Sequence, residues 1–100
     1  MTTEQRNNAI AAFMGGPEYL RRQHFSNLTD EQFTFVGPED LRFHASWDWM
    51  IPVWTKVRYE MTPTMVIAAI QYTDTADLIA MHQLVSNVCI NWCNAKGINL

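Results

Sequence analysis

The sequence is short of charge, of cysteine and of long apolar runs, and each shortage excludes a class of protein. Its longest apolar run, Met65 to Ile70, cannot cross a bilayer. Seven basic residues face ten acidic ones, which gives a net charge of −3, whereas proteins that bind long nucleic acids usually carry a basic stripe. No secretory signal is recognisable, so we expect a cytosolic protein in which Cys89 and Cys93 stay reduced.

What the sequence does contain is enough apolar side chain for a core. Hydrophobic residues make up 48% of a chain of 100 residues, which is the length of one domain. We therefore expect a single domain over residues 1–100 that needs neither a metal nor a disulfide to fold.

Three segments have the apolar spacing of amphipathic helices. A helix over residues 3–14 begins at a capping sequence and stops at Gly15-Gly16-Pro17. A second begins after Ser46 and contains Pro52, which should kink it or delay its start towards Ile51. The last is capped by Thr73 or Thr75 and ends at Gly97. Its stripe consists of Leu78, Met81, Val85, Val88, Cys89 and Trp92.

The remaining segments predict strands or irregular chain. Residues 17–40 are expected to be irregular apart from a short strand at Phe33–Val36. Residues 41–44 alternate apolar and polar, as a half-buried strand or an extended segment does. Met65 to Tyr72 is a candidate buried strand, although its two alanines leave a helix open. The predicted fold is α+β, with three helices packed on a small, mostly antiparallel sheet.

One motif is specific. The run Ser46-Trp47-Asp48-Trp49-Met50-Ile51-Pro52-Val53, with residues 41–44 before it, resembles a signature of short, largely uncharacterised proteins of bacteriophages and prophages. Phe13-Met14-Gly15 and the stretch over residues 90–94 also match these proteins. A weaker similarity is to phage domains described as an α-β-α sandwich. The short segment between the second and third helices departs from that fold and leaves the size of the sheet open. The resemblance implies a phage origin and an α+β fold, but no established activity.

The aromatic motif also suggests a binding site. Trp47 and Trp49 cannot share one face of a helix, and the apolar stripe places Trp47 inward and Trp49 outward. Either could simply anchor the core, or one could stack on a base. Cations close in sequence could meet phosphates. The candidate ligand-binding residues are Arg42, His44, Trp47, Trp49 and Arg58, with Arg21 and Arg22 as further candidates.

No catalytic or metal motif is recognisable, so we expect neither an enzyme nor a cofactor. Asp48 favours the positive end of its helix and would need His44 as a partner to act in catalysis. His82, Cys89 and Cys93 share one face of the last helix, but their spacing is not that of a zinc finger, and we expect no bound metal.

These observations favour a non-catalytic phage anti-defence protein of the host cell cytoplasm. It would bind and sequester a nucleotide immune signal, such as a cyclic dinucleotide or an ADP-ribose derivative. The chain's many aromatic and methionine side chains predict a homo-oligomer with Trp49, Trp92 or nearby methionines at the interface. Two alternatives stay open: a protein-binding inhibitor of a host defence enzyme, and a small nucleotide hydrolase that uses His44 and Asp48.

Overall fold

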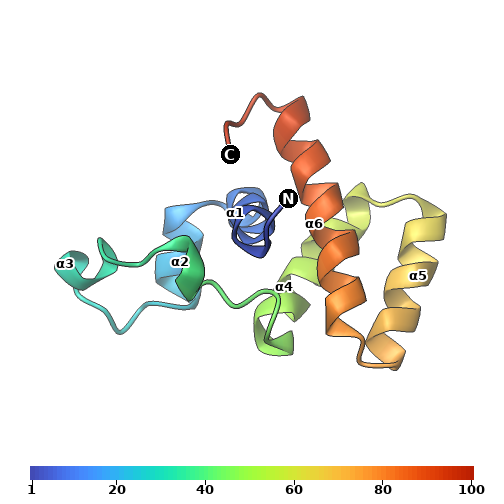
Figure 1. The fold of residues 1–100 in the computed structure, drawn as a ribbon, viewed down its shortest axis with the longest axis horizontal. Coiled ribbons are helices and arrows are strands. Elements are labelled where there is room, and N and C mark those ends of the chain that lie inside the picture. Colours follow the sequence, from blue (N-terminus) through green and yellow to red (C-terminus); the bar gives the residue numbers. More distant parts are fainter.

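The computed structural model describes residues 1–100 and is entirely helical (Figure 1). The predicted α+β class is therefore wrong, because the structure has no strand and no sheet. There are six α-helices and two short 3-10 helices, in the order α1 (Thr3–Met14), α2 (Pro17–Gln23), α3 (Asp30–Phe33), η1 (Pro38–Asp40), α4 (Trp47–Val57), η2 (Arg58–Glu60), α5 (Pro63–Asp74) and α6 (Leu78–Ala95).

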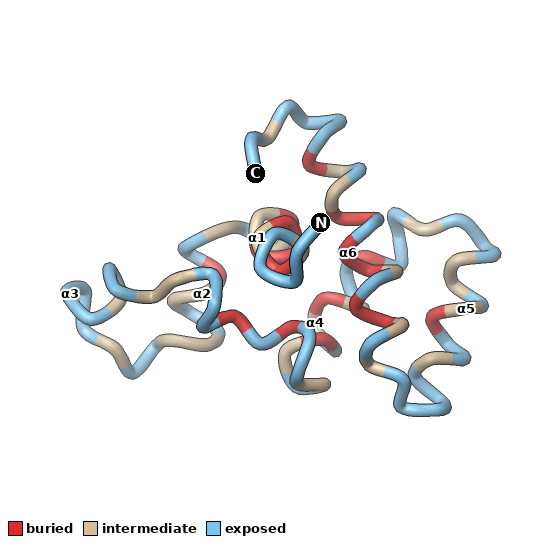
Figure 2. The backbone as a smooth tube through the Cα atoms, in the orientation of Figure 1, coloured by how far each residue is buried: buried red, intermediate tan, exposed pale blue.

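The core forms where α1, α4 and α5 pack against α6. In Figure 1, α1 is seen end-on beside α6, α4 passes behind α6, and α5 runs along the far side. Each helix contributes fully buried side chains, as the red segments of Figure 2 show. These side chains include Ile10 and Phe13 from α1, Met50, Val53 and Val57 from α4, Ala69 from α5, and Met81, Val85 and Cys89 from α6.

The segment predicted as a buried strand, Met65 to Tyr72, lies within α5. Thr62 caps this helix by accepting a hydrogen bond from the Met65 amide at 3.3 Å, and Pro63 occupies the first turn, where no amide donor is needed. The two alanines favour the helix, and no second strand is present to pair with this one. A short apolar run does not distinguish the two structures.

The other two predicted strands are also absent. Phe33 ends α3, and the amides of Phe35 and Val36 close turns onto carbonyls three residues earlier. Residues 41–44 alternate as expected, since Leu41 and Phe43 are buried while Arg42 and His44 are exposed. This stretch has no strand partner, and its second half is a turn closed by the Ala45 amide, which donates to the Arg42 carbonyl at 3.0 Å. It is therefore neither a strand nor an extended segment throughout.

Residues 17–40 are more regular than predicted, because proline begins helices here as well as ending them. Gly15 ends α1 with a φ of 127°, which only glycine adopts readily, as the sequence predicted. Pro17 and Pro38 then take the first positions of α2 and η1. A proline in the first turn has a backbone angle already suited to a helix.

The first and last predicted helices are confirmed, with one change of cap. Thr2 and Gln5 form a capping box at the start of α1. Asp77, rather than Thr73 or Thr75, caps α6 by accepting from the Ala80 amide at 3.1 Å. The middle helix starts at Trp47 and runs through Pro52, so the delayed start is wrong. None of the helices has the length and apolar character needed to span a membrane.

Candidate functional site

A buried asparagine joins two histidines between α1 and α6. Asn7 is 1% exposed, and its Nδ2 donates to the Leu41 carbonyl at 3.2 Å and to His44 Nδ1 at 2.9 Å. Because that carbonyl can only accept, the amide oxygen of Asn7 must face the other way. There it accepts from His82 Nε2 at 2.8 Å. The network therefore places the proton of neutral His44 on Nε2 and that of neutral His82 also on Nε2.

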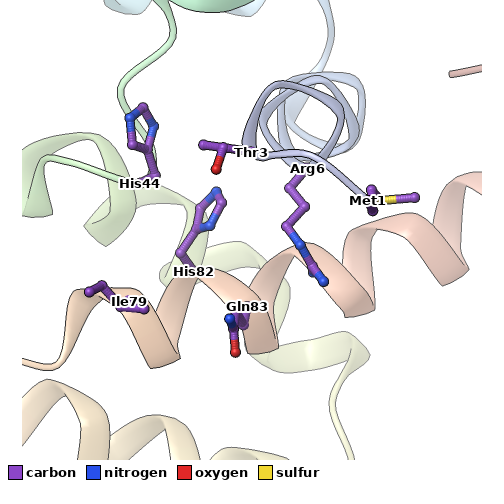
Figure 3. A pocket seen from close by; sticks show the side chains of 7 residues that line it. All are labelled: Met1, Thr3, Arg6, His44, Ile79, His82 and Gln83. Atoms are coloured by element: carbon purple, nitrogen blue, oxygen red, sulfur yellow. The ribbon is translucent and has the colours of Figure 1, made fainter.

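The two histidines line a hollow of about 310 Å³ that we call the histidine pocket (Figure 3). Arg6 and His82 reach into it from the facing helices α1 and α6, while His44 comes from the segment before α4. The rings of His44 and His82 lie with their centroids 5.9 Å apart. The pocket is lined by Met1, Thr3, Arg6, His44, Ile79, His82 and Gln83.

Arg6 gives the histidine pocket a positive charge, although Glu4 and Glu39 line an adjoining hollow that shares Thr3 and His44 with it. The Nη1 atom of Arg6 donates to Ser86 Oγ and to Asn87 Oδ1, each at 2.7 Å, so neutral acceptors hold the guanidinium in place. No acidic side chain lines the pocket. A fixed guanidinium with remaining N–H donors is the group that proteins use for phosphate and carboxylate.

His82 is held in its neutral form. Its pKa is lowered from 6.5 to about 4, chiefly by burial and to a lesser extent by the nearby charges of His44 and Arg6. An anion bound beside these groups would offset that repulsion and favour the protonated imidazole. The pocket therefore offers one permanent cation, Arg6, and one group, His82, that an anion would help to protonate.

Trp49 is not the exposed platform that the sequence predicted. It is half-buried, and its ring stacks on His24 at 3.6 Å between centroids with an angle of 4°. Phe43 and Phe25 meet it edge-on at 5.1 and 5.9 Å. The expected division between an inward Trp47 and an outward Trp49 is wrong, since both are half-buried and both pack against the core.

His24 is the group that occupies the Trp49 face, and it is itself largely enclosed. Burial lowers the pKa of His24 and raises the pKa of neighbouring Tyr19, whose ring meets His24 at 5.7 Å. Trp92, the other tryptophan predicted at an interface, packs edge-on against Phe13 at 5.1 Å. Much of the aromatic surface is therefore used within the chain.

The predicted cations are dispersed. Arg21 pairs with Asp30 at 2.6 Å and lies over the Phe33 ring, and Arg22 is exposed at the end of α2. Arg42 lines a different hollow beside Glu39 and Asp40, whose carboxylates disfavour a phosphate there. Arg58 is exposed and contacts its neighbour Tyr59. Of the seven candidate residues, the structure places only His44 in the histidine pocket.

Sequence reasoning missed Arg6, Asn7 and His82 as members of one site. The sequence held one partial indication of this site. His82 falls on the apolar stripe of α6, where a buried polar group needs a hydrogen-bond partner. It was considered only as a metal ligand. No group of three or more His, Cys, Asp or Glu side chains lies close enough to hold a metal ion. Cys89 and Cys93 are buried thiols, and burial raises the pKa of both.

Comparison of the chain with family models, with curated proteins and with solved structures gave no match.

Proposed function

We propose that this chain binds a small phosphate-bearing molecule of the nucleotide class in the histidine pocket and holds it without converting it. The observation that carries the proposal is Arg6, a guanidinium fixed by Ser86 and Asn87 in a pocket that no carboxylate lines. His44 offers a further donor at Nε2, and Ile79 offers an apolar surface for a sugar or base.

The volume of the pocket bears on the ligand. About 310 Å³ is the lower end of the range of small-molecule sites, so the pocket fits a mononucleotide or one end of a larger nucleotide. Trp47 and Trp49 do not line it, and the proposal no longer uses them as stacking platforms. The resemblance to phage proteins gives the proposal its biological form, in which the chain sequesters a nucleotide immune signal in the host cell.

We also propose that the protein does not catalyse a reaction on the bound ligand. The Nδ1 atom of His44 is engaged by Asn7, and neither a hydrogen bond nor an ion pair joins His44 to Asp48, as a catalytic pair would require. The low pKa of His82 leaves it a weak base at neutral pH. Both features support binding over hydrolysis.

The test is to incubate the purified protein with a panel of nucleotide signals, including a cyclic dinucleotide and an ADP-ribose derivative, and then to heat it. Depletion followed by release of the intact ligand is expected. Release of an altered ligand would favour the hydrolase alternative. If no ligand is depleted, the protein-binding inhibitor becomes the better hypothesis.

Substitutions locate the site. Arg6→Gln should weaken binding about tenfold or more, because one charge-assisted contact with phosphate is lost. Arg58→Gln is the matched control, since Arg58 is exposed outside the pocket, and it should bind as the unaltered chain does. Equal affinity of the Arg6→Gln and Arg58→Gln variants would contradict the assignment to this pocket.

A further inference from the structure

Residues 20–40 form a part of the molecule that has no core of its own. We call this part the distal lobe; it contains the end of α2, α3 and η1, and it projects away from α4, α5 and α6 in Figure 1. No residue between Tyr19 and Leu41 is fully buried, and Figure 2 shows this stretch without red. Six large apolar side chains nevertheless lie in it: Leu20, Phe25, Leu28, Phe33, Phe35 and Val36.

Four of these apolar side chains, Phe25, Leu28, Phe35 and Val36, line a shallow groove of about 580 Å³ on one face of the distal lobe. The Phe35 side chain is 80% exposed, the most of any large hydrophobic residue in the chain. A phenylalanine in this position gains little from the fold, and exposed aromatic side chains beside a groove are typical of protein-binding surfaces.

The charge around the groove is negative. The stretch from Gln23 to Leu41 has no lysine or arginine and holds four of the chain's ten acidic residues. Asp30 is paired with Arg21, whereas Glu39 and Asp40, which line the groove, have no cationic partner within 4.0 Å. Arg42 stands at the same rim and offsets one of these two charges.

We infer that this groove docks a short amphipathic segment of another protein, with apolar residues on one face and lysine or arginine beside them. The apolar side chains would cover Phe35 and Leu28, and the cations would meet Glu39 and Asp40. An acidic segment or a nucleic acid is disfavoured by the same carboxylates. The groove lies outside the histidine pocket, so the inference is independent of nucleotide binding.

The probe is a fluorescein-labelled peptide of about 16 residues with leucines at helical spacing and lysines elsewhere, compared with its isomer that carries glutamate in place of lysine. Fluorescence anisotropy should show binding of the lysine peptide and much weaker binding of the glutamate peptide. Raising the salt from about 50 to about 300 mM should weaken, but not abolish, the interaction. No binding, or equal binding of the two peptides, would overturn the inference.

Two substitutions locate the contact. Phe35→Ser should weaken binding of the lysine peptide about tenfold or more. Glu39→Lys should weaken the lysine peptide and strengthen the glutamate peptide, a gain that an unfolded variant could not produce. The matched controls are Ile67→Ser, which removes an exposed side chain from α5, and Glu60→Lys, which reverses an exposed acid in η2. If the controls weaken binding as much, the groove is not the site.

A second copy of the chain could occupy the groove instead, because its exposed neighbours Arg58 and Tyr59 offer a cation beside an aromatic ring. Analytical sedimentation of the protein alone distinguishes this self-association from binding of a different protein. Self-association that Phe35→Ser abolishes, without binding of either peptide, would assign the groove to a second copy and overturn the inference of a different protein partner.

Discussion

The helical body and the distal lobe carry apolar side chains of similar size but use them differently. In the body, α1, α4, α5 and α6 enclose a single cluster of buried residues. The distal lobe contacts the core through half-buried side chains at its near end, Leu20, His24 and Phe25. Further out it is held by local polar contacts: the capping box of Thr29 and Gln32, the hydrogen bond from Gly37 to Asp40, and the Arg21–Asp30 ion pair. Such contacts contribute about 1 kcal/mol each, so the distal lobe should be the less stable part and the one available to a partner.

The largest test of this comparison is to truncate one phenylalanine in each part. Phe43 is 0% exposed and packs against Trp49 and His24, so Phe43→Ala should lower the free energy of unfolding by about 3–5 kcal/mol. Phe35→Ala should change it by less than about 0.5 kcal/mol, as exposed positions do. Urea denaturation followed by tryptophan fluorescence measures both. A large loss in Phe35→Ala would mean that the distal lobe has a core after all.

The second test uses pH, because the buried histidine lies in the body. The pKa of His82 in the folded protein, about 4, is below the ordinary 6.5, so protons bind more tightly to the unfolded chain. The stability that His82 contributes is complete above pH 6.5 and is lost as the pH falls through 4. The loss should be on the order of 2–3 kcal/mol.

Variants isolate that contribution. His24 acts in the same direction, since burial lowers its pKa too, and every carboxylate adds its own dependence. The difference between the unaltered chain and His82→Gln, each measured from pH 7 to pH 4, removes these shared terms. Parallel curves for the two proteins would show that His82 is not held neutral by the fold.

The parts of the fold that the sequence predicted are those in which local signals agree. Residues 3–14 and the last helix combine a cap, a regular apolar stripe and a glycine stop, and both were predicted correctly. Pro17 was interpreted only as a stop, although it begins α2, and Pro63 begins α5 in the same way. The apolar run at 65–72 fits a strand or a helix, and only the absence of a pairing strand decides between them.

The candidate site could not be predicted for a different reason: its members are far apart along the chain. His82 meets Asn7 across 75 residues, and Arg6 meets Ser86 across 80. Trp49 likewise stacks on His24, and the helical periodicity of the sequence does not relate these two positions. The sequence pattern around the tryptophan motif placed His44 among the candidate ligand-binding residues. Its partners in the histidine pocket are determined by the packing of α1 against α6.

The smallest expected change in stability comes from removing a helix cap. It gives the sharpest comparison, because the helical body and the distal lobe carry the same capping box. Thr2 with Gln5 begins α1, and Thr29 with Gln32 begins α3. Thr2→Ala should lower the global stability by about 1 kcal/mol, since α1 unfolds together with the core. Thr29→Ala should leave the global unfolding midpoint unchanged, since the loss falls on a part that opens locally.

Hydrogen exchange distinguishes the two losses. Thr29→Ala should speed exchange of the amides that α3 protects, such as Phe33, whose N–H donates to the Thr29 carbonyl at 2.9 Å, while amides within α6 exchange as before. Thr2→Ala should instead speed exchange throughout α1 and α6 by a similar factor. If Thr29→Ala also accelerates α6, the distal lobe unfolds together with the body, and the contrast between a packed body and a locally held lobe does not hold.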